Sequence, residues 1–272
     1  MRISEMFSKP GARPAFMPYV CCGDPSVVFT VRLVETLVAN GADAIEFGIP
    51  FSDPIADGKT IQGASSRALA NEMTPQKAID AISLLRKKGI RVPITAMTYY
   101  NIVFANGTGN FLKKLRDAGA DGLIVPDVPL EESGPLREKC AEAGIDLICM
   151  ITPNCTDERI KRISEKSQGF LYAVSVLGIT GARGEVAPEA VEFVKRAKRI
   201  ASIPIAVGFG ISQPAHAAEF AKAGADAIIV GSGLVEVYAK HMKDGKFDEE
   251  KALGEVAEFA KAMVSSRLPG KT

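Results

Sequence analysis

A short phrase recurs along this chain of 272 residues and limits the folds that are open to it. The copies are NGADAIEFG at 40–48, AGADGLIVPD at 118–127, AGIDLICM at 143–150 and AGADAIIVGS at 223–232. Each copy is typical of the last turn of a helix, a glycine that caps it, and a following strand. The recurrence therefore predicts a fold built from successive helix and strand units.

Further apolar runs and amphipathic patterns complete the series. The runs at 15–22, 92–100, 170–176 and 203–210 bring the expected strands to eight. Helical periodicity lies between the strands, at 26–40, 74–89, 109–119, 131–144, 156–167, 188–200, 213–224, 234–240 and 248–267. Strands that are nearly all apolar are typical of parallel sheets covered on both faces.

Eight such units close most simply into one (β/α)8 TIM barrel, so we expect residues 1–272 to form a single domain. Residues 2–9 are expected to form an extra N-terminal helix that plugs the N-terminal end of the barrel. The alternative is an open, doubly wound sheet with a nucleotide site. No G-x-G-x-x-G follows the first expected strand, where GDPSVV stands instead, so the barrel is favoured.

Charge and composition exclude several classes of protein. The 33 basic and 32 acidic residues are interspersed, which gives no support for nucleic acid binding. No apolar run is long enough for a membrane span and no apolar targeting segment is visible, so we expect a cytoplasmic protein. The five cysteines are odd in number and lack C-x-x-C spacing, which favours reduced core residues. His216 and His241 are both expected in helices, and no metal site is expected.

In such a barrel, ligands bind where the strands end and their following loops begin. Two expected strands end in GFG at 208–210 and GSG at 231–233, where backbone N–H groups, the start of a helix and the Ser232 hydroxyl could hold a phosphate. Gly181, in a loop that could act as a lid, could add another amide. Alternatively, these glycines serve only tight turns.

Two carboxylates stand out in the segment IEFGIPFSDPIADG. Glu46 lies within an expected strand, where alternation can point it into the barrel, raise its pKa and allow it to give and accept a proton. The alternative is a glutamate satisfied by a polar group on a neighbouring strand. Asp57 follows in a loop stiffened by prolines, as a positioned carboxylate would require. Asp53, Asp24 and Asp127 are more typical of turns, although Asp127 could orient a neighbour.

The residues that other types of enzyme chemistry require are absent from the expected positions. No lysine lies within an expected strand, which argues against a Schiff-base aldolase, and no G-x-S-x-G motif is present. Carboxylate acid/base chemistry on a phosphorylated substrate remains. The substrate's apolar part would face the side chains of Tyr19, Met97, Tyr99, Tyr172 and Phe209.

The motifs PYVCCGDP, IEFGIPFSDPIADG, YYNIVFANG, PDVPLEES, GITGARG, VGFGIS and IVGSGLVE, in this order, resemble the tryptophan synthase alpha chain family over nearly the whole chain. The resemblance implies a lyase that cleaves indole-3-glycerol phosphate to indole and glyceraldehyde 3-phosphate without a cofactor of its own. It also implies a partner, the tryptophan synthase beta chain, which carries pyridoxal phosphate, in an α2β2 tetramer. The loop at 50–58 and the loop after the sixth strand would face that partner.

The resemblance assigns roles to individual residues. Glu46 would be the general acid/base, and Asp57 would bind the indole N–H. Tyr172 matches the family's tyrosine at the sixth strand, and Thr180 matches the threonine that closes against Asp57. The remaining matches are the phosphate contacts Gly181, Gly210, Gly231 and Ser232 and the indole-pocket residues Tyr19, Met97 and Phe209.

Two competing functions remain open from the sequence. One is another phosphate-binding barrel, such as a sugar-phosphate isomerase or a thiamin-phosphate-type synthase, which would share the glycine motifs but would not need Glu46 together with Asp57. The other is a regulatory subunit that binds a ligand without turnover. A buried acid without a catalytic use would cost such a subunit stability, which argues against it.

Overall fold

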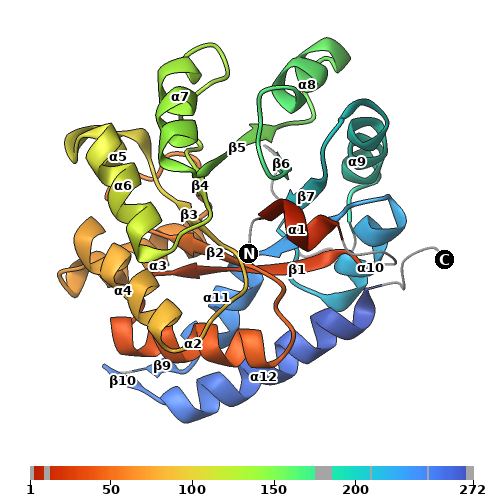
Figure 1. The fold of residues 1–272 in the computed structure, drawn as a ribbon. Helices are drawn as coiled ribbons and strands as arrows, with labels where there is room; N and C mark the ends of the chain where they lie inside the picture. Colours follow the sequence, from red (N-terminus) through yellow and green to blue (C-terminus); the bar gives the residue numbers. More distant parts are fainter. Residues whose placement is uncertain (1–2, 9–12, 175–185, 209, 244, 268–272) are drawn as a thin grey trace.

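Eight parallel strands close into a barrel in the order of the sequence (Figure 1). The computed structural model describes residues 3–8, 13–174, 186–208, 210–243 and 245–267. The strands are β1 (Ala15–Cys21), β2 (Ile45–Gly48), β3 (Ile94–Met97), β4 (Gly122–Ile124), β5 (Asp146–Ile151), β6 (Leu171–Val174), β7 (Ile205–Gly208) and β8 (Ala227–Val230). Parallel pairing of β1 with β8 completes the closure and confirms the predicted TIM barrel.

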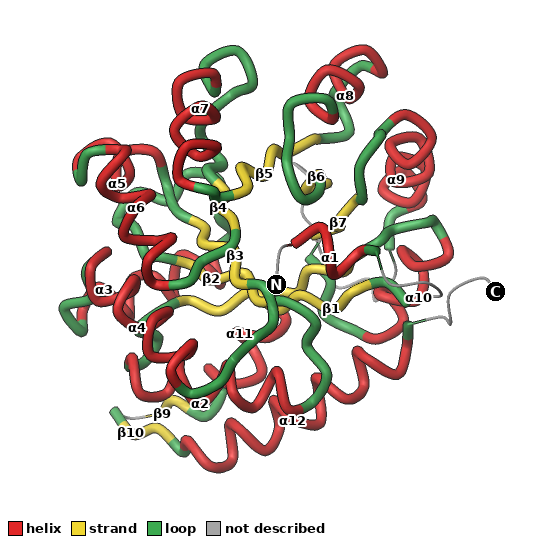
Figure 2. Tube along the Cα trace, viewed as in Figure 1, coloured by secondary structure: helices red, strands yellow, loops and turns green. Residues whose placement is uncertain are grey.

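Helices form the outer layer of the barrel (Figure 2). Those predicted from periodicity are α2 (Val27–Ala39), α4 (Pro75–Lys87), α6 (Thr108–Ala118), α7 (Gly134–Ala143), α8 (Asp157–Ser164), α9 (Pro188–Ile200), α10 (Pro214–Lys222), α11 (Ser232–Ala239) and α12 (Glu249–Ser266). Side-chain caps begin several of them; Ser26, for example, accepts a hydrogen bond from the N–H of Phe29 at the start of α2.

The fold explains why the recurring sequence contains a glycine and an aspartate. The glycine ends a helix with a positive φ in all four copies, for example 95° at Gly119. The aspartate of three copies accepts a hydrogen bond from the N–H of the first or second residue of the preceding strand, as Asp121 does from Ile94 at 2.9 Å. The repeat therefore fastens neighbouring strands together at the N-terminal end of the barrel.

The predicted N-terminal helix is α1 (Ile3–Phe7), and it lies across the end of the barrel that faces the viewer in Figure 1. Ile3 and Met6 are buried in one cluster with Ala15, Ala44 and Phe170 inside the barrel. The space at Gly122 is filled by Ile3, whose Cδ1 would lie 2.8 Å from a Cβ there. This helix closes the N-terminal end and leaves the other end for a ligand.

Four elements were not predicted: the helices α3 (Lys59–Ala70) and α5 (Tyr100–Ala105) and the strands β9 (Met242–Lys243) and β10 (Lys246–Phe247). The residues that α3 buries, Ala64, Ser65 and Ala68, are small, so its sequence KTIQGASSRALA has no stripe of large apolar side chains. The prediction of a strand over 92–100 was wrong at its end, because the strand stops at Met97 and a helix begins at Tyr100.

The prediction that His241 lies in a helix was also wrong. Helix α11 ends at Ala239, and His241 lies in a turn before the hairpin of β9 and β10, in which Met242 pairs with Phe247. Gly245, with φ at 72°, helps to turn the chain between these strands. His216 lies in α10 as predicted.

All five cysteines are free thiols. Among the described residues, no helix is long and apolar enough to cross a membrane.

Candidate active site

The interior of the barrel changes from apolar to polar toward the C-terminal ends of the strands. Alternation along β1 places Ala15 and Met17 in the interior cluster and Tyr19 at the next inward position. Strand register pairs Tyr19 with Glu46, and Glu46 with Thr95. Three polar side chains therefore stand side by side at one level of the barrel.

Glu46 is 1% exposed and lies between Ile45 and Phe47, which belong to the core between the strands and the helices. Burial raises the pKa of Glu46 from 4.5 to about 8; a hydrogen bond from Tyr172 opposes the rise, and the charge of Asp57 adds to it. Its Oε2 atom has no hydrogen-bond partner among the described residues. Tyr172, on β6, is thus a polar neighbour that satisfies Glu46 only in part.

Asp57 lies in the loop between β2 and α3, and the phenol of Tyr99 holds this loop. The Ala56 N–H donates to the Tyr99 hydroxyl at 2.9 Å, and the ring of Phe51 stacks on that of Tyr99 with centroids 5.2 Å apart. Burial raises the pKa of Asp57 from 3.8 to about 6, and a hydrogen bond from Tyr99 opposes the rise. At neutral pH Asp57 is therefore mostly ionised while Glu46 is mostly protonated.

Sequence reasoning assigned Tyr99 only to the apolar lining and missed its bonds to the Asp57 loop. These bonds were missed because the predicted strand over 92–100 would place Tyr99 inside the sheet, whereas β3 ends at Met97. The available signal was the pair of tyrosines directly after an apolar run, which is typical of a strand end in a barrel.

Two glycines make room for two tyrosines. A Cβ at Gly48 would lie 2.3 Å from the Tyr19 hydroxyl oxygen, and a Cβ at Gly208 would lie 2.6 Å from Cε2 of Tyr172. Neither contact is compatible with a larger residue unless the ring moves. Gly208 is the first residue of the predicted GFG motif and the last residue of β7. Its missing side chain leaves space for the ring of Tyr172, and Gly210 lies beyond the end of the strand.

The turn after β7 and the start of α11 are in direct contact. A Cβ at Gly233 would lie 2.7 Å from Cα of Ser212 and 3.0 Å from the carbonyl oxygen of Ile211. Gly231 is the N-cap of α11 and Ser232 is its first residue. The first turn of a helix has backbone N–H groups without intrahelical partners, so this junction can receive an anion.

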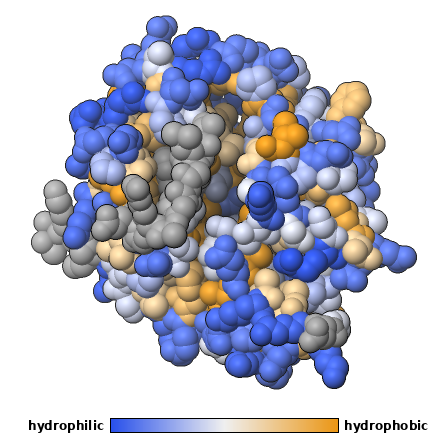
Figure 3. All heavy atoms as spheres, turned by 180° about the vertical axis from the view of Figure 1, so that it is seen from behind, coloured by the Kyte–Doolittle hydropathy of each residue, from blue (hydrophilic) through white to orange (hydrophobic). Residues whose placement is uncertain are grey.

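The structure brings Tyr19, Glu46, Met97, Asp57 and Tyr172 to the C-terminal end of the barrel. Met97 ends β3, in register with Gly48 on one side and Ile124 on the other. Figure 3 views the molecule from this side, where a hollow lies near its centre. Three further predicted residues, Thr180, Gly181 and Phe209, lie outside the described residues.

The three aspartates expected in turns differ in their surroundings. Asp53 accepts a hydrogen bond from the Ser52 hydroxyl, and Asp127 accepts one from the N–H of Tyr100 at the start of α5. Asp24 follows β1 as expected of a turn residue, but its carboxylate is also fully buried and forms an ion pair with Arg67, which the turn prediction did not include.

A separate cavity of about 320 Å³ lies between the ends of β4 and β5 and helices α7 and α8. Its lining includes Leu136, Cys149, Met150 and Arg159, but neither Glu46 nor Asp57. It is therefore distinct from the carboxylate site. Among the described residues, no group of three or more His, Cys, Asp and Glu side chains could hold a metal ion.

Comparison with known proteins gives one family. A family model described as tryptophan synthase alpha chain matches residues 7–264. The tryptophan synthase alpha chain of Methanocaldococcus jannaschii is 45% identical over 255 residues, which cover 92% of this chain and 90% of the relative. That of Methanosarcina acetivorans is 48% identical over 238 residues, which cover 87% and 86%.

A solved structure agrees with the sequence comparison. A chain from the tryptophan synthase α2β2 complex of Pyrococcus furiosus has a TM-score of 0.87 and 37% identity, over 93% of this chain and 98% of that chain. The likeness therefore extends over the whole barrel, including the strands that carry Tyr19, Glu46 and Tyr172.

Proposed function

The chain belongs to the tryptophan synthase alpha chain family, and we propose that it performs the reaction of that family with Glu46 as general acid/base and Asp57 as the carboxylate that binds the indole ring. The enzyme is a carbon–carbon lyase that cleaves indole-3-glycerol phosphate to indole and glyceraldehyde 3-phosphate in tryptophan biosynthesis. The observation that carries the proposal is the pairing of the buried Glu46 with the half-buried Asp57, whose pKa values are raised to different levels by burial.

The first step is the transfer of the Glu46 proton to C3 of the indole ring. With a pKa of about 8, Glu46 carries this proton at neutral pH, and the Tyr172 hydroxyl stabilises the carboxylate that forms. The protonated ring then has a positive charge that is shared with its nitrogen. The now ionised Glu46 removes a proton from the glycerol hydroxyl next to the ring, and the carbon–carbon bond breaks.

Asp57 stabilises the charge that appears on the ring nitrogen. Its pKa of about 6 leaves it ionised at neutral pH, and the hydrogen bond from Tyr99 fixes its position. As the carbon–carbon bond breaks, the electrons return to the ring and the positive charge disappears. Asp57 is therefore of most use in the charged intermediate, which is where a catalytic contact lowers the barrier.

The rest of the substrate would occupy the remaining predicted site. Tyr19, Met97 and Phe209 would line the pocket for the indole ring. Gly210, Gly231 and Ser232, with Thr180 and Gly181 from the loop after β6, would hold the phosphate and close the site. The contact between Gly233 and Ser212 supports one shared anion site at the ends of β7 and β8.

We extend the proposal to the assembly. The tryptophan synthase beta chain would be the partner, in an α2β2 complex like that of Pyrococcus furiosus, and pyridoxal phosphate would be bound only by that partner. Ile55 and Phe104, 83% and 68% exposed, lie in segments that follow β2 and β3. Ile55 belongs to the loop at 50–58 that is expected to face the partner, which would cover it in the complex.

Residues 1–272 would work as a single TIM-barrel domain in the cytoplasm. The five free thiols are in keeping with a reducing compartment.

Release of indole from indole-3-glycerol phosphate tests the proposal. The purified chain is assayed alone and with a beta chain, beside Glu46→Gln, Asp57→Asn and the control Glu142→Gln, which changes an exposed carboxylate paired with Lys139. We expect turnover that rises with the partner, is lost in both site variants, and is unchanged in the control. Full activity of Glu46→Gln would refute the assigned role.

A further inference from the structure

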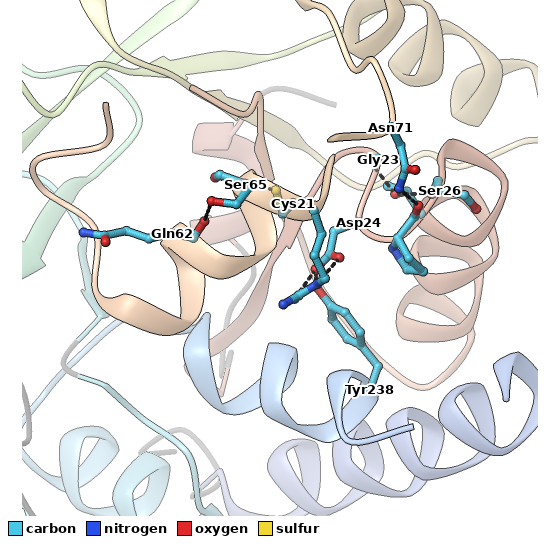
Figure 4. A network of polar contacts seen from close by, with 12 residues as sticks. Cys21, Gly23, Asp24, Ser26, Gln62, Ser65, Asn71 and Tyr238 are labelled. Atoms are coloured by element: carbon cyan, nitrogen blue, oxygen red, sulfur yellow. Dashed lines mark hydrogen bonds and ion pairs between the residues drawn. The ribbon is translucent and has the colours of Figure 1, made fainter. Parts of the chain in front are cut away.

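The carboxylate of Asp24 is shared between two elements of the active site. Asp24 follows β1 and is 0% exposed. Nε and Nη2 of Arg67 donate to its two oxygens at 2.7 and 2.8 Å, and the Tyr238 hydroxyl donates to Oδ2 at 2.7 Å. Figure 4 shows Asp24 facing Tyr238 within this network, with Cys21 and Ser65 close by.

Arg67 belongs to α3, the helix that begins directly after the Asp57 loop. The side-chain amide of Gln62, also on α3, donates to the backbone carbonyl of Asp57 at 2.8 Å. The position of Asp57 therefore depends on the position of α3, and Arg67 fastens α3 to Asp24.

Tyr238 belongs to α11, whose first turn carries Gly231 and Ser232. Tyr238 is fully buried, and the bond to Asp24 holds its hydroxyl in place. Two further contacts join α11 to α3: Thr60 donates to Glu236 at 3.3 Å, and Cδ1 of Ile61 lies 3.6 Å from where a Cβ of Gly231 would stand.

We propose that Asp24 is a positioning residue that fixes the distance between the Asp57 loop and the phosphate-binding turn of α11. This inference rests on the proposed function, since it assigns the indole end of the substrate to Asp57 and the phosphate end to α11. A buried carboxylate is costly unless it keeps its partners, and the two-pronged contact with Arg67 also fixes an orientation. Asp24 thus holds α3 and α11 in one arrangement.

A substrate whose two ends bind at different subsites requires a fixed separation between them. Loosening that separation should affect the linked substrate far more than either fragment alone, because each fragment can follow its own subsite. A residue that only stabilises the fold would not produce this difference.

The test compares the linked substrate with its fragments in Tyr238→Phe, Arg67→Lys and Asp24→Asn, at a temperature where circular dichroism shows each variant folded. We expect kcat/KM for indole-3-glycerol phosphate to fall about tenfold to a hundredfold. The affinities for inorganic phosphate and for indole should change by less than about threefold. Tyr238→Phe removes one hydroxyl and serves as the mild variant if Asp24→Asn does not fold.

The matched control is Asp121→Asn, which breaks the partly buried pair with Arg86 (2.7 Å) at the opposite end of the barrel. It should lower the melting temperature without changing kcat/KM. Equal losses for substrate and fragments, no loss of kcat/KM in the folded variants, or the same kcat/KM loss in Asp121→Asn would overturn the inference. An inactive parent chain would overturn the proposed function, and this inference with it.

Discussion

The ring of Tyr172 fills the space that a side chain at residue 208 would need, since a Cβ on Gly208 would lie 2.7 Å from the Tyr172 hydroxyl oxygen. That hydroxyl is the hydrogen-bond donor to Glu46. A glycine at the end of β7 therefore determines how a carboxyl on β2 is held, across the interior of the barrel.

Gly208→Ala should displace Tyr172 and weaken its bond to Glu46. A hydrogen bond to a charged group contributes about 1.5–3 kcal/mol, so we expect kcat to fall by about tenfold or more. Steady-state indole release measures the change. Tyr172→Phe and the double variant should show losses that do not add, because both remove the same bond.

Gly254→Ala is the control for this substitution. Gly254 lies in α12, and no neighbouring atom comes within 4 Å of the place where its Cβ would stand. The alanine should leave kcat unchanged and raise the free energy of unfolding by about 0.5–1 kcal/mol. Additive losses from Gly208→Ala and Tyr172→Phe would contradict the proposed link between the two residues.

The pH dependence of kcat should report the protonation of Glu46. Because burial raises its pKa to about 8, the proton needed at C3 of the indole ring is present below that pH and absent above it. We expect kcat to fall as the pH rises through about 8. Tyr172→Phe removes the bond that favours the carboxylate, so this fall should move to higher pH. A fall at the same pH in both proteins would contradict the assignment.

The same shift in pKa predicts how stability depends on pH. Between pH 4.5 and about 8 the folded chain keeps a proton on Glu46 that the unfolded chain releases, so folding loses stability as the pH rises. The loss approaches about 1.4 kcal/mol per pH unit for one full proton. Glu46→Gln has no proton to release at this position. The difference between its free energy of unfolding and that of the parent should therefore increase with pH in this range and become constant at higher pH. Urea unfolding at several pH values measures the difference, and a constant difference would refute it.

The sequence predicted the barrel because period and repeat are local signals. All four copies of the repeat carry the capping glycine, and in three of them the aspartate binds the preceding strand, so one pattern specified both the element and its connection. The inward position of Glu46 followed from alternation in the same way. Helix α3 was missed because the residues that it buries are small, and α5 because its six residues, YNIVFA, are too few to show a helical period.

The contacts that hold the site were beyond prediction because they join residues far apart in the chain. Asp24 meets Tyr238 across 214 positions, and Ala56 meets Tyr99 across 43. A GDP sequence is typical of a turn, and only the packing of α3 and α11 against β1 turns its aspartate into a buried ion-pair partner. Gly208 belongs to the GFG motif that predicts an anion site, but the side chain beside it is that of Tyr172.

Tyr99→Phe should move the acid limb of the kcat/KM profile. The Tyr99 hydroxyl lowers the pKa of Asp57, which burial has raised to about 6, so its removal should raise that pKa further. The ionised form of Asp57 would then be lost at higher pH. We expect a shift of about one to two pH units, since a hydrogen bond to a charged group contributes about 1.5–3 kcal/mol. Tyr100→Phe, on the adjacent residue, is the control, and an equal shift in that variant would contradict the assignment.

Two buried threonines should respond in opposite ways to replacement by valine. The hydroxyl of Thr95, beside Glu46, has no hydrogen-bond partner among the described residues, whereas that of Thr30 accepts from Gly23 N at 3.0 Å and donates to the Ser26 carbonyl at 2.9 Å. Thr95→Val removes an unsatisfied polar group and should raise the free energy of unfolding by about 1 kcal/mol, while Thr30→Val should lower it by about 1–3 kcal/mol. Urea unfolding of both variants measures these changes. A loss of stability in Thr95→Val would mean that its hydroxyl has a partner in solution, and the Oε2 atom of Glu46, on the paired strand, would be the first candidate.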